Sequence, residues 1–297
     1  MIPPLQPGDR IAILSTARKI TASEIEAAVS AFESWGLEVV LGETIGASYN
    51  QFAGDDALRL QNLQQMLDDE SIKAIVCARG GYGTTRIIDQ VDFTGFKKHP
   101  KWLVGFSDVT TLHSHIHNLG LPTIHAIMPV LFAKEGAGPS VESLRQLLFG
   151  EEICYSLAPH AFNRSGTGTG QLVGGNLSML HTLTGTRSDI STDGKILFLE
   201  DLDEYLYHID RMMVHLDRSG KLANLAGLII GDMSDMHDNT VPFGKTAYEI
   251  ILEHTGKYNY PVCYGFPVGH EPLNLALVCG REATLAVSEA GVKLSYC

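Results

Sequence analysis

The feature that most constrains this chain is an alternation of two hydrophobic periods through its first half. Short apolar runs typical of buried strands alternate with stretches that have the 3.6-residue period of amphipathic helices. Such alternation predicts an α/β fold with a parallel sheet wrapped by helices, because parallel strands need long crossover connections. Strands are expected at residues 10–16, 37–41, 71–78, 101–105 and 122–128, and helices at residues 21–36, 55–69, 84–91 and 108–119.

The alternation stops near residue 150, where the chain becomes rich in Gly, Ser, Thr and Asn. A length of 297 residues is long for one core, so we expect an N-terminal domain at 1–150, a linker at 151–170 and a C-terminal domain at 171–297. The stretch GTGTG (166–170) does not follow a strand and open a helix, which favours a linker over a phosphate loop. The second domain should be mixed α/β and barrel-like, with strands at 195–200, 226–231, 261–265, 274–280 and 282–288, and helices at 204–220 and 245–256.

Charge and composition exclude several classes of protein. The formal net charge of −12 argues against nucleic acid or an anionic membrane as the main partner. We see neither a signal-peptide pattern nor an apolar stretch near the roughly 20 residues needed to cross a bilayer, and expect a cytoplasmic protein. The cysteines at 77, 154, 263, 279 and 297 form no CxxC pair, which indicates reduced thiols rather than a disulfide framework. Cys77 ends a strand-like run and is a candidate nucleophile, but its apolar neighbours favour core packing.

A serine stands at the corner between a predicted strand and a predicted helix. In WLVGFSDVTTLH (102–113), the apolar run ends at Gly105 and the helical pattern begins directly after Ser107. Such a corner exposes a side-chain oxygen above the sheet edge, and the N–H groups of the helix start favour developing negative charge. The G-x-S-x-G motif is absent, and a helix cap formed by Ser107 or Asp108 is the common alternative. The stretch by itself leaves both roles open.

A glycine-rich loop, ARGGYG (78–83), follows the preceding predicted strand. Glycines allow the backbone to approach a ligand closely, and successive N–H groups can form a nest for an oxyanion. The loop does not match the dinucleotide fingerprint G-x-G-x-x-G, and a plain turn is the alternative. Because parallel strands end at the same edge of a sheet, an oxyanion hole divided between this loop and the Ser107 corner is feasible.

A serine nucleophile also needs a base and a group that orients the base. His270 lies in a loop bounded by Gly and Pro, a common place for a catalytic base, and His125 competes at the end of a predicted strand. His113 and His117, with the spacing i, i+4, could bind a metal, but no HExxH motif accompanies them and a packed or solvated helix face is favoured for them and for His115. Four carboxylates follow one another near the end of the predicted strand 195–200, where charges usually serve a helix start: Glu200, Asp201, Asp203 and Glu204.

Five motifs in order resemble the serine LD-carboxypeptidase family, also called muramoyltetrapeptide carboxypeptidases. They are ARGGYG (78–83), GFSD (105–108), LVGGNL (172–177), FLED (198–201) and VGHEPLN (268–274). The resemblance runs over almost the whole chain. It implies a flavodoxin-like parallel-sheet domain, a smaller C-terminal domain and a Ser–Glu–His triad in the cleft between them, without a metal or cofactor.

Carried over residue by residue, the resemblance implies that Ser107 is the nucleophile, His270 the base and Glu200 the group that orients it. The backbone N–H groups of Gly81 and Asp108 match the oxyanion donors of the family. One departure lies in IHAIMP (124–129), where Ala126 replaces a glycine that members often have after the histidine, which bears on the pocket floor and not on the triad.

The implied activity is release of the terminal D-alanine from a murein tetrapeptide in cell-wall recycling, through an acyl-enzyme on Ser107. The family also implies a homodimer, for which the helix face around Tyr205, Ile209, Met212 and Met213 is available, although core packing is its expected use. Three alternatives are a microcin-type immunity peptidase that cleaves peptide–nucleotide antibiotics, a non-catalytic ligand-binding protein on the same fold, and a metal hydrolase that uses the histidine helix. A length near the shorter family members and the absence of an aromatic-rich insertion favour the murein peptidase.

Overall fold

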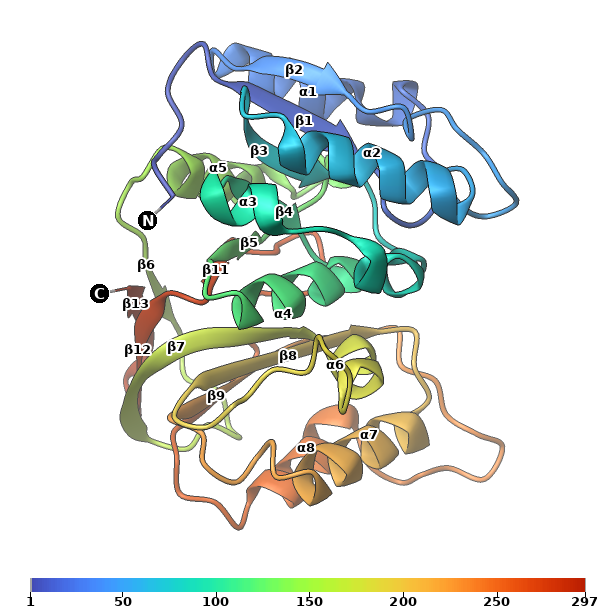
Figure 1. The fold of residues 1–297 in the computed structure, drawn as a ribbon. Helices are drawn as coiled ribbons and strands as arrows, with labels where there is room; N and C mark the ends of the chain where they lie inside the picture. Colours follow the sequence, from blue (N-terminus) through green and yellow to red (C-terminus); the bar gives the residue numbers. More distant parts are fainter. Residues whose placement is uncertain (1, 297) are drawn as a thin grey trace.

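The strands of the chain form two sheets, one of six and one of seven strands, in a computed structural model that describes residues 2–296. Figure 1 shows the two sheets one above the other, with α4 (Thr110–Asn118) between them. The labelled strands β1, β3 and β8 all end on the same side of the molecule, at the right of the view. The carboxyl ends of parallel strands from both sheets therefore face one side, where sites of α/β proteins are usually built.

The first sheet has the order β11-β5-β4-β3-β1-β2, and all its pairs are parallel except that of β11 with β5. Without β11 this is the flavodoxin-like order of a doubly wound sheet, as expected. The expected strand 274–280 forms β11, which belongs to this sheet and not to the second one. The bounds are β1 (Arg10–Leu14), β2 (Glu38–Leu41), β3 (Ile72–Cys77), β4 (Trp102–Gly105), β5 (Thr123–His125) and β11 (Leu277–Cys279).

Helices cover both faces of this sheet because successive strand residues point to opposite sides. Ile11 and Ile13 pack with α1 (Glu26–Ser34) and α5 (Gly138–Leu148), whereas Ala12 and Leu14 pack with α2 (Asp56–Asp68), α3 (Thr94–Lys98) and α4. The predicted helix at 84–91 is wrong: the segment forms two short 3-10 helices, Thr84–Arg86 and Ile88–Gln90. Neither α3 nor α5 was expected from the sequence pattern.

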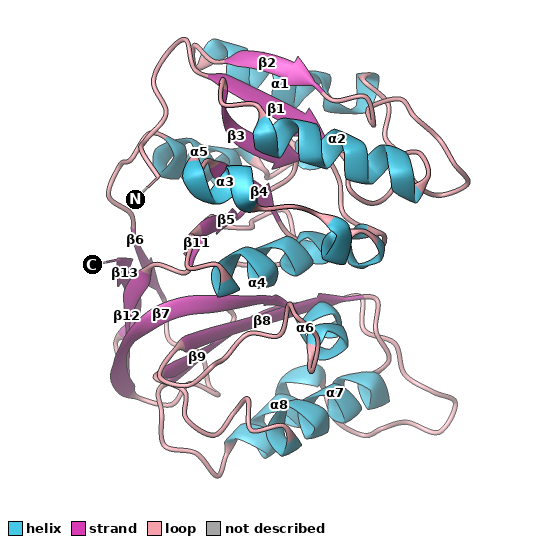
Figure 2. Cartoon of the chain, viewed as in Figure 1, coloured by secondary structure: helices cyan, strands magenta, loops and turns pink. Residues whose placement is uncertain are grey.

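The second sheet is mixed, with the order β10-β9-β8-β7-β12-β13-β6. Strands β7 to β10 are parallel, and β7, β12, β13 and β6 are antiparallel. Buried side chains of β8 and β9 share one core with those of β12 and β13, so the sheet bends like an open half-barrel. Figure 2 shows the helices α6 to α8 on its other face. The bounds are β6 (Cys154–Leu157), β7 (Gly166–Asn176), β8 (Ile196–Leu202), β9 (Gly227–Ser234), β10 (Val262–Tyr264), β12 (Glu282–Ser288), β13 (Gly291–Tyr296), α6 (Leu177–Leu183), α7 (Leu206–Arg218) and α8 (Ala247–Thr255).

The segment interpreted as a linker contains two strands. The stretch GTGTG opens β7, an eleven-residue strand at the centre of the second sheet, and β6 also lies within residues 151–170. A Cβ at Gly168 would collide with the carbonyl oxygen of Ala226, and one at Gly170 with that of Gly194. Glycine is therefore needed here because another backbone segment lies against the strand, which is a known use of glycine inside a sheet.

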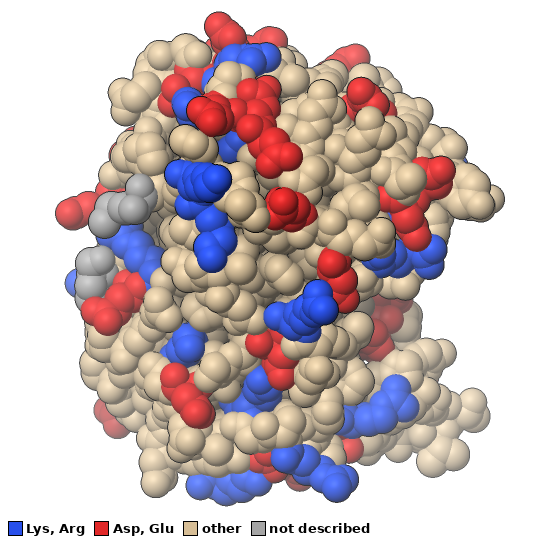
Figure 3. Space-filling view, in the orientation of Figure 1, with Lys and Arg blue, Asp and Glu red and all other residues tan. Residues whose placement is uncertain are grey.

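The remaining expectations concern thiols, surface charge and α7. The four described cysteines are free, and Cys77, Cys263 and Cys279 are buried while Cys154 is exposed; Cys297 lies outside the described residues. Figure 3 shows acidic and basic side chains interspersed on the visible face. In the described part of the chain, no helix combines the length and the apolar character that a membrane span requires. Ile209, Met212 and Met213 on the apolar face of α7 pack inside the second core, as expected, whereas Tyr205, just before the helix, is exposed.

Candidate active site

Ser107 occupies a sharp corner between β4 and α4. Its φ of +62° is in the left-handed region, which costs a residue with a Cβ of order 1–3 kcal/mol. Gly105, with φ +157°, makes the corner possible, because a Cβ there would lie 2.9 Å from a methyl carbon of Val109. A 3-10 helix, Ser107–Val109, then leads into α4. The corner lifts a half-buried hydroxyl out of the line of the strand, so Ser107 is not a simple helix cap.

Hydrogen bonds connect Ser107 to two residues of the other half of the chain. The Nε2 atom of His270 lies 3.1 Å from Oγ of Ser107, and Nδ1 of His270 lies 2.7 Å from Oε2 of Glu200. Glu200 is fully buried, and the His270 side chain is 13% exposed. Since a carboxylate only accepts hydrogen bonds, Nδ1 carries a proton and donates it to Glu200, which leaves Nε2 of the neutral ring free to accept from the hydroxyl.

Burial and the neighbouring carboxylate act on the pKa of His270 in opposite directions. Burial lowers the pKa because the interior solvates the imidazolium poorly, whereas the charge of Glu200 and its hydrogen bond raise it. The net result is a pKa above the ordinary value of histidine. The ring edge also contacts Phe106, with ring centroids 4.9 Å apart. His270 is thus positioned as a base, and the nearby Glu200 stabilises the proton that it takes up.

The glycine loop after β3 packs directly against the Ser107 corner. A Cβ at Gly80 would lie 3.3 Å from Oγ of Ser107, and Gly81 has a φ of +106°. Asp108 is buried and accepts a hydrogen bond of 2.9 Å from the backbone N–H of Thr84, which ties the loop to the corner. The loop and the helix start are therefore neighbours, as expected from the parallel sheet.

Arg59 is a buried residue of this region that the sequence interpretation missed. Its Nη1 donates to the carbonyl oxygens of Thr16 at 2.6 Å and Gly83 at 2.9 Å, and Nη2 contacts Asp56. The guanidinium thus joins the loops that follow β1 and β3. The sequence contained a sign of this role. Arg59 has the helical spacing of Leu63 and Met66 on the buried face of α2, where an arginine needs a partner for its charge.

The competing nucleophile and bases have other contacts. Burial raises the pKa of Cys77 to about 12, so its thiol stays protonated. His113 is buried between Gly105 and Thr123: Nε2 lies 2.9 Å from the Gly105 carbonyl and Nδ1 2.8 Å from the Thr123 hydroxyl, and burial lowers its pKa to about 4. His125 is fully buried beside Phe106 at a centroid distance of 5.7 Å.

The histidine helix does not gather its rings around one point. Both ring nitrogens of His113 are engaged as described, while His115 contacts the Ser188 hydroxyl at 2.9 Å and stacks on Phe93. Burial lowers the pKa of His117 to about 4. Among residues 2–296, no group of three His, Cys, Asp or Glu side chains is arranged to hold a metal ion. This geometry gives the metal-hydrolase alternative no support.

The acidic neighbours of Glu200 differ from the expectation in one case. Asp201 is 2% exposed and not a surface charge: it accepts from Asn176 Nδ2 at 2.8 Å and from the N–H and hydroxyl of Ser178. Asp203 is exposed and contacts His237 at 2.5 Å. Glu204 contacts His208 at 2.6 Å. Of the four carboxylates, Glu200 is the one that contacts His270.

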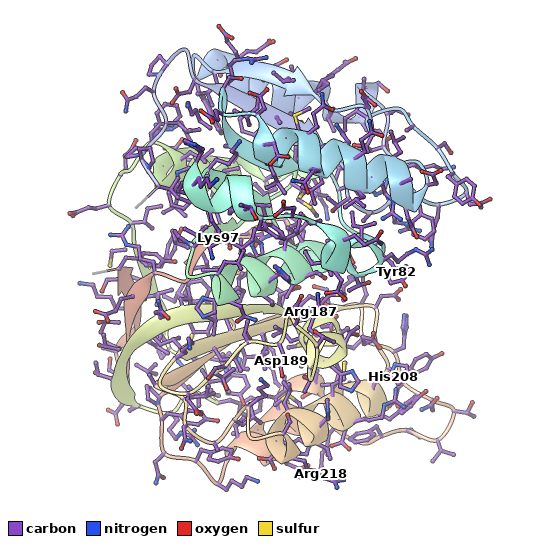
Figure 4. All side chains as sticks on the ribbon, in the orientation of Figure 1. Tyr82, Lys97, Arg187, Asp189, His208 and Arg218 are labelled. Carbon is purple, nitrogen blue, oxygen red and sulfur yellow. The ribbon has the colours of Figure 1, made fainter. Side chains whose placement is uncertain are left out.

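A cavity of about 720 Å³ opens beside the base. Glu271, next to His270 in the chain, and Asp232, near the carboxyl end of β9, line it together with Tyr248 and Lys245. Burial, with the charges of Glu271 and Glu200, raises the pKa of Asp232 to about 7. Figure 4 shows Tyr82 of the glycine loop and His208 of α7 on the side of the molecule where the strands of both sheets end.

Comparisons with known proteins agree with this architecture. The family model described as the LD-carboxypeptidase N-terminal domain matches residues 11–126, and that of the LD-carboxypeptidase C-terminal domain matches residues 169–285. The chain is 36% identical to a probable murein peptide carboxypeptidase of Bacillus subtilis, over 97% of this chain and 94% of the relative. It is 30% identical to the murein tetrapeptide carboxypeptidase of Pseudomonas aeruginosa, over 94% of each chain.

Solved structures show the same fold. The muramoyltetrapeptide carboxypeptidase from Oxalobacter formigenes superimposes with a TM-score of 0.86 at 26% identity, covering 97% of this chain and 98% of the other. The microcin C7 self-immunity protein MccF superimposes with a TM-score of 0.89 over 100% of this chain and 98% of its own, but at 20% identity this likeness concerns the fold alone. Matches in both halves of the chain, and relatives aligned along nearly its whole length, place this protein in the LD-carboxypeptidase family.

Proposed function

We propose that this protein is a serine LD-carboxypeptidase that removes the terminal D-alanine from murein tetrapeptides, with Ser107, His270 and Glu200 as its catalytic triad. The observation that carries the proposal is the continuous chain of hydrogen bonds from Oγ of Ser107 through the His270 ring to buried Glu200. The substrate follows from the names of relatives at 30–36% identity, which are murein peptide and murein tetrapeptide carboxypeptidases.

Acylation begins when Oγ of Ser107 attacks the carbonyl carbon of the bond that precedes D-alanine. His270 Nε2 takes the hydroxyl proton. Glu200 stabilises the resulting imidazolium by accepting a hydrogen bond from its Nδ1–H. The carbonyl oxygen becomes an oxyanion, to which the backbone N–H groups of Gly81 and Asp108 donate. When the tetrahedral intermediate collapses, the C–N bond breaks, His270 gives its proton to the amine, and D-alanine leaves.

Deacylation repeats these steps with water as the nucleophile. His270 removes a proton from the water, the hydroxide attacks the ester carbon, and the bond to Oγ of Ser107 breaks as Oγ regains a proton. The tripeptide is released. Its diamino acid now carries a new carboxylate, which is attached to the L-configured carbon of that residue. The cavity beside Glu271 offers room for the rest of the peptide on the His270 side of the cleft.

The proposed domains, 1–150 and 171–297, place the nucleophile on the first and the other two triad residues on the second, so that the cleft between them holds the site. A cytoplasmic location, a homodimer and the absence of nucleic acid and membrane partners belong to the same proposal. Ile209, Met212 and Met213 of α7 are buried in the second core, so of the four residues considered for a dimer only Tyr205 is exposed. Light scattering during size-exclusion chromatography measures the assembly.

One experiment tests the activity and its alternatives. Purified protein is incubated with a murein tetrapeptide and, separately, with a peptide–nucleotide antibiotic, and the products are followed by mass spectrometry. Loss of the mass of D-alanine from the tetrapeptide supports the proposal, whereas cleavage of the antibiotic alone supports the immunity function. An unchanged mass in both samples supports a ligand-binding protein. EDTA should leave turnover unaltered, and a loss that zinc restores would support a metal hydrolase.

A further inference from the structure

A carboxypeptidase that releases a single residue has to recognise a free carboxylate near the bond it cuts. In a terminal D-alanine, three covalent bonds join the scissile carbonyl carbon to the carboxylate carbon, which puts the carboxylate oxygens roughly 4–5 Å from the reacting carbon. A guanidinium is the side chain that best matches a carboxylate, through two parallel hydrogen bonds. The protein carries a net charge of −12, so such a cation has to be provided locally.

Four arginines surround the glycine loop, and three of them already contact a carboxylate. Arg59 is buried against Asp56, and Arg86 lies 2.7 Å from the same side chain. Arg79 lies 3.7 Å from Glu24. For Arg18, by contrast, no ion pair is found within residues 2–296.

Arg18 lies over the loop that contacts the nucleophile. Its side chain is exposed, and its aliphatic stem covers Gly81, where a Cβ would collide with Cγ and Cδ of the arginine. Its backbone N–H donates to the carbonyl oxygen of Gly80 at 3.4 Å. A Cβ at Gly80 would in turn lie 3.3 Å from Oγ of Ser107. One layer of loop backbone therefore separates the stem of Arg18 from the nucleophile.

The topology of the first sheet puts Arg18 where a ligand is expected. Arg18 follows β1 and the glycine loop follows β3, and these adjacent strands connect to neighbours on opposite sides, β2 beyond β1 and β4 beyond β3. The carboxyl ends of two such strands form the switch point of a doubly wound sheet, where ligands bind. A cation at this point lies next to the glycine loop, which carries the proposed oxyanion donor Gly81.

We propose that the guanidinium of Arg18 binds the terminal carboxylate of the peptide substrate, on the leaving-group side of Ser107. The inference rests on the proposed carboxypeptidase function and specifies the substrate class further: peptides whose last residue carries a free carboxylate. It also gives a function to the exposed Arg18, which forms no ion pair within residues 2–296.

The test uses two tetrapeptides that differ only at the terminus, one ending in D-alanine and the other in D-alanine amide. The wild type should have a higher kcat/KM for the acid. Arg18→Gln removes the charge but keeps most of the stem over Gly81, and should lower kcat/KM about 100-fold for the acid and less than threefold for the amide. Arg18→Lys should restore part of the preference, because it keeps the charge and loses the paired geometry.

Arg79→Gln is the matched control, since Arg79 lies in the glycine loop that Arg18 covers and pairs with Glu24. It should keep the wild-type preference for the acid. The inference is overturned if Arg18→Gln keeps that preference, if Arg79→Gln abolishes it, or if both peptides lose activity equally in Arg18→Gln and Arg18→Lys. A wild type that cuts neither tetrapeptide would instead contradict the proposed function, and one that cuts both equally would show that no residue reads the carboxylate.

Discussion

The two halves of the active site are held in place by different physical means. On the first sheet, backbone conformation does the positioning: Gly81, Gly105 and Ser107 all have positive φ, and the loop and the corner pack on each other. On the second sheet, burial and charge do it: Glu200 is fully buried and accepts a hydrogen bond of 2.7 Å from His270. Substitutions in the first half should therefore act through geometry, and those in the second through protonation.

This difference has a measurable consequence in pH profiles. A displaced loop or nucleophile lowers turnover at every pH, because no titrating group is changed. A change in the environment of His270 instead moves the pH at which activity appears, since Nε2 has to be deprotonated to act as the base. The shape of the pH–rate curve thus distinguishes the two halves even where the losses in turnover are similar.

The largest effect is expected for Ser107→Ala. Without Oγ no acyl-enzyme forms, so turnover of a murein tetrapeptide should fall on the order of 10⁴-fold or more. The variant should fold, because alanine replaces a half-buried serine of similar size. Mass spectrometry measures turnover and circular dichroism measures folding. Near-native turnover in a folded variant would remove Ser107 from the mechanism.

Glu200→Gln should be almost as damaging, for an electrostatic reason. The amide can donate its N–H to Nδ1 and favour the tautomer whose Nε2 is already protonated, which costs about 10³–10⁴ in turnover. Because the Glu200 charge raises the pKa of His270 against the effect of burial, the residual activity should appear at a lower pH than in the wild type. A pH profile of kcat/KM checks this shift. If the acidic limb of this pH profile does not move, Glu200 does not control the protonation of His270.

Gly81→Val should act through geometry alone. The new side chain meets Arg18 and is strained at a φ of +106°, so the loop and its oxyanion donor move, which costs about 10²–10³ in turnover. Gly120→Val is the control, because Gly120 has a φ of +79° and no atom within 4 Å of a Cβ. It carries similar strain far from the site and should lose stability without losing turnover. The turnover of Gly81→Val should fall by the same factor at every pH.

The sequence predicts the first sheet well because its strand–helix units are local. The pairing of β11 with β5 joins Leu277 to His125 across the chain, and no local pattern carries that information. The start of β7 was wrongly interpreted as a linker for another reason, which concerns its glycines. Glycine required by a neighbouring backbone and glycine in a flexible loop look the same in a sequence, and the collision at Gly168 is visible only in three dimensions.

The motifs predicted which residues lie together in the candidate site, but not the environment of each residue. The sequence interpretation ended the strand at Glu200, whereas β8 continues to Leu202. Successive strand residues point to opposite faces. Glu200 therefore turns to His270, and Asp201 turns to Asn176 and the start of α6, where it is buried and not exposed. The neighbouring carboxylates thus belong to different networks.

Asp201→Asn should affect turnover less than the three variants above, and its effect on stability should depend on pH. Burial, followed by the charge of Glu200, raises the pKa of Asp201 to about 6. An unfolded aspartate has a pKa near 3.9, so the folded protein binds more protons between about pH 4 and 6. The contribution of Asp201 to stability is then greatest below pH 4 and decreases as the pH rises to 6. Asparagine does not titrate and lacks this change.

Asp201→Asn and Asp203→Asn should differ in their effect on stability. Asn at 201 brings an amide donor toward Asn176 and Ser178, which already donate to this side chain, and should cost about 1–3 kcal/mol at pH 4.5. The deficit relative to the wild type should shrink at pH 7.5, where the wild type has to ionise a buried carboxyl. Asp203 is exposed with a φ of +62°, a conformation that asparagine adopts readily, so Asp203→Asn should alter neither stability nor turnover appreciably. Urea unfolding at both pH values and turnover on one tetrapeptide measure these effects. If either variant lost turnover by orders of magnitude while Glu200→Gln stayed active, the carboxylate that orients His270 would be misassigned by a few positions.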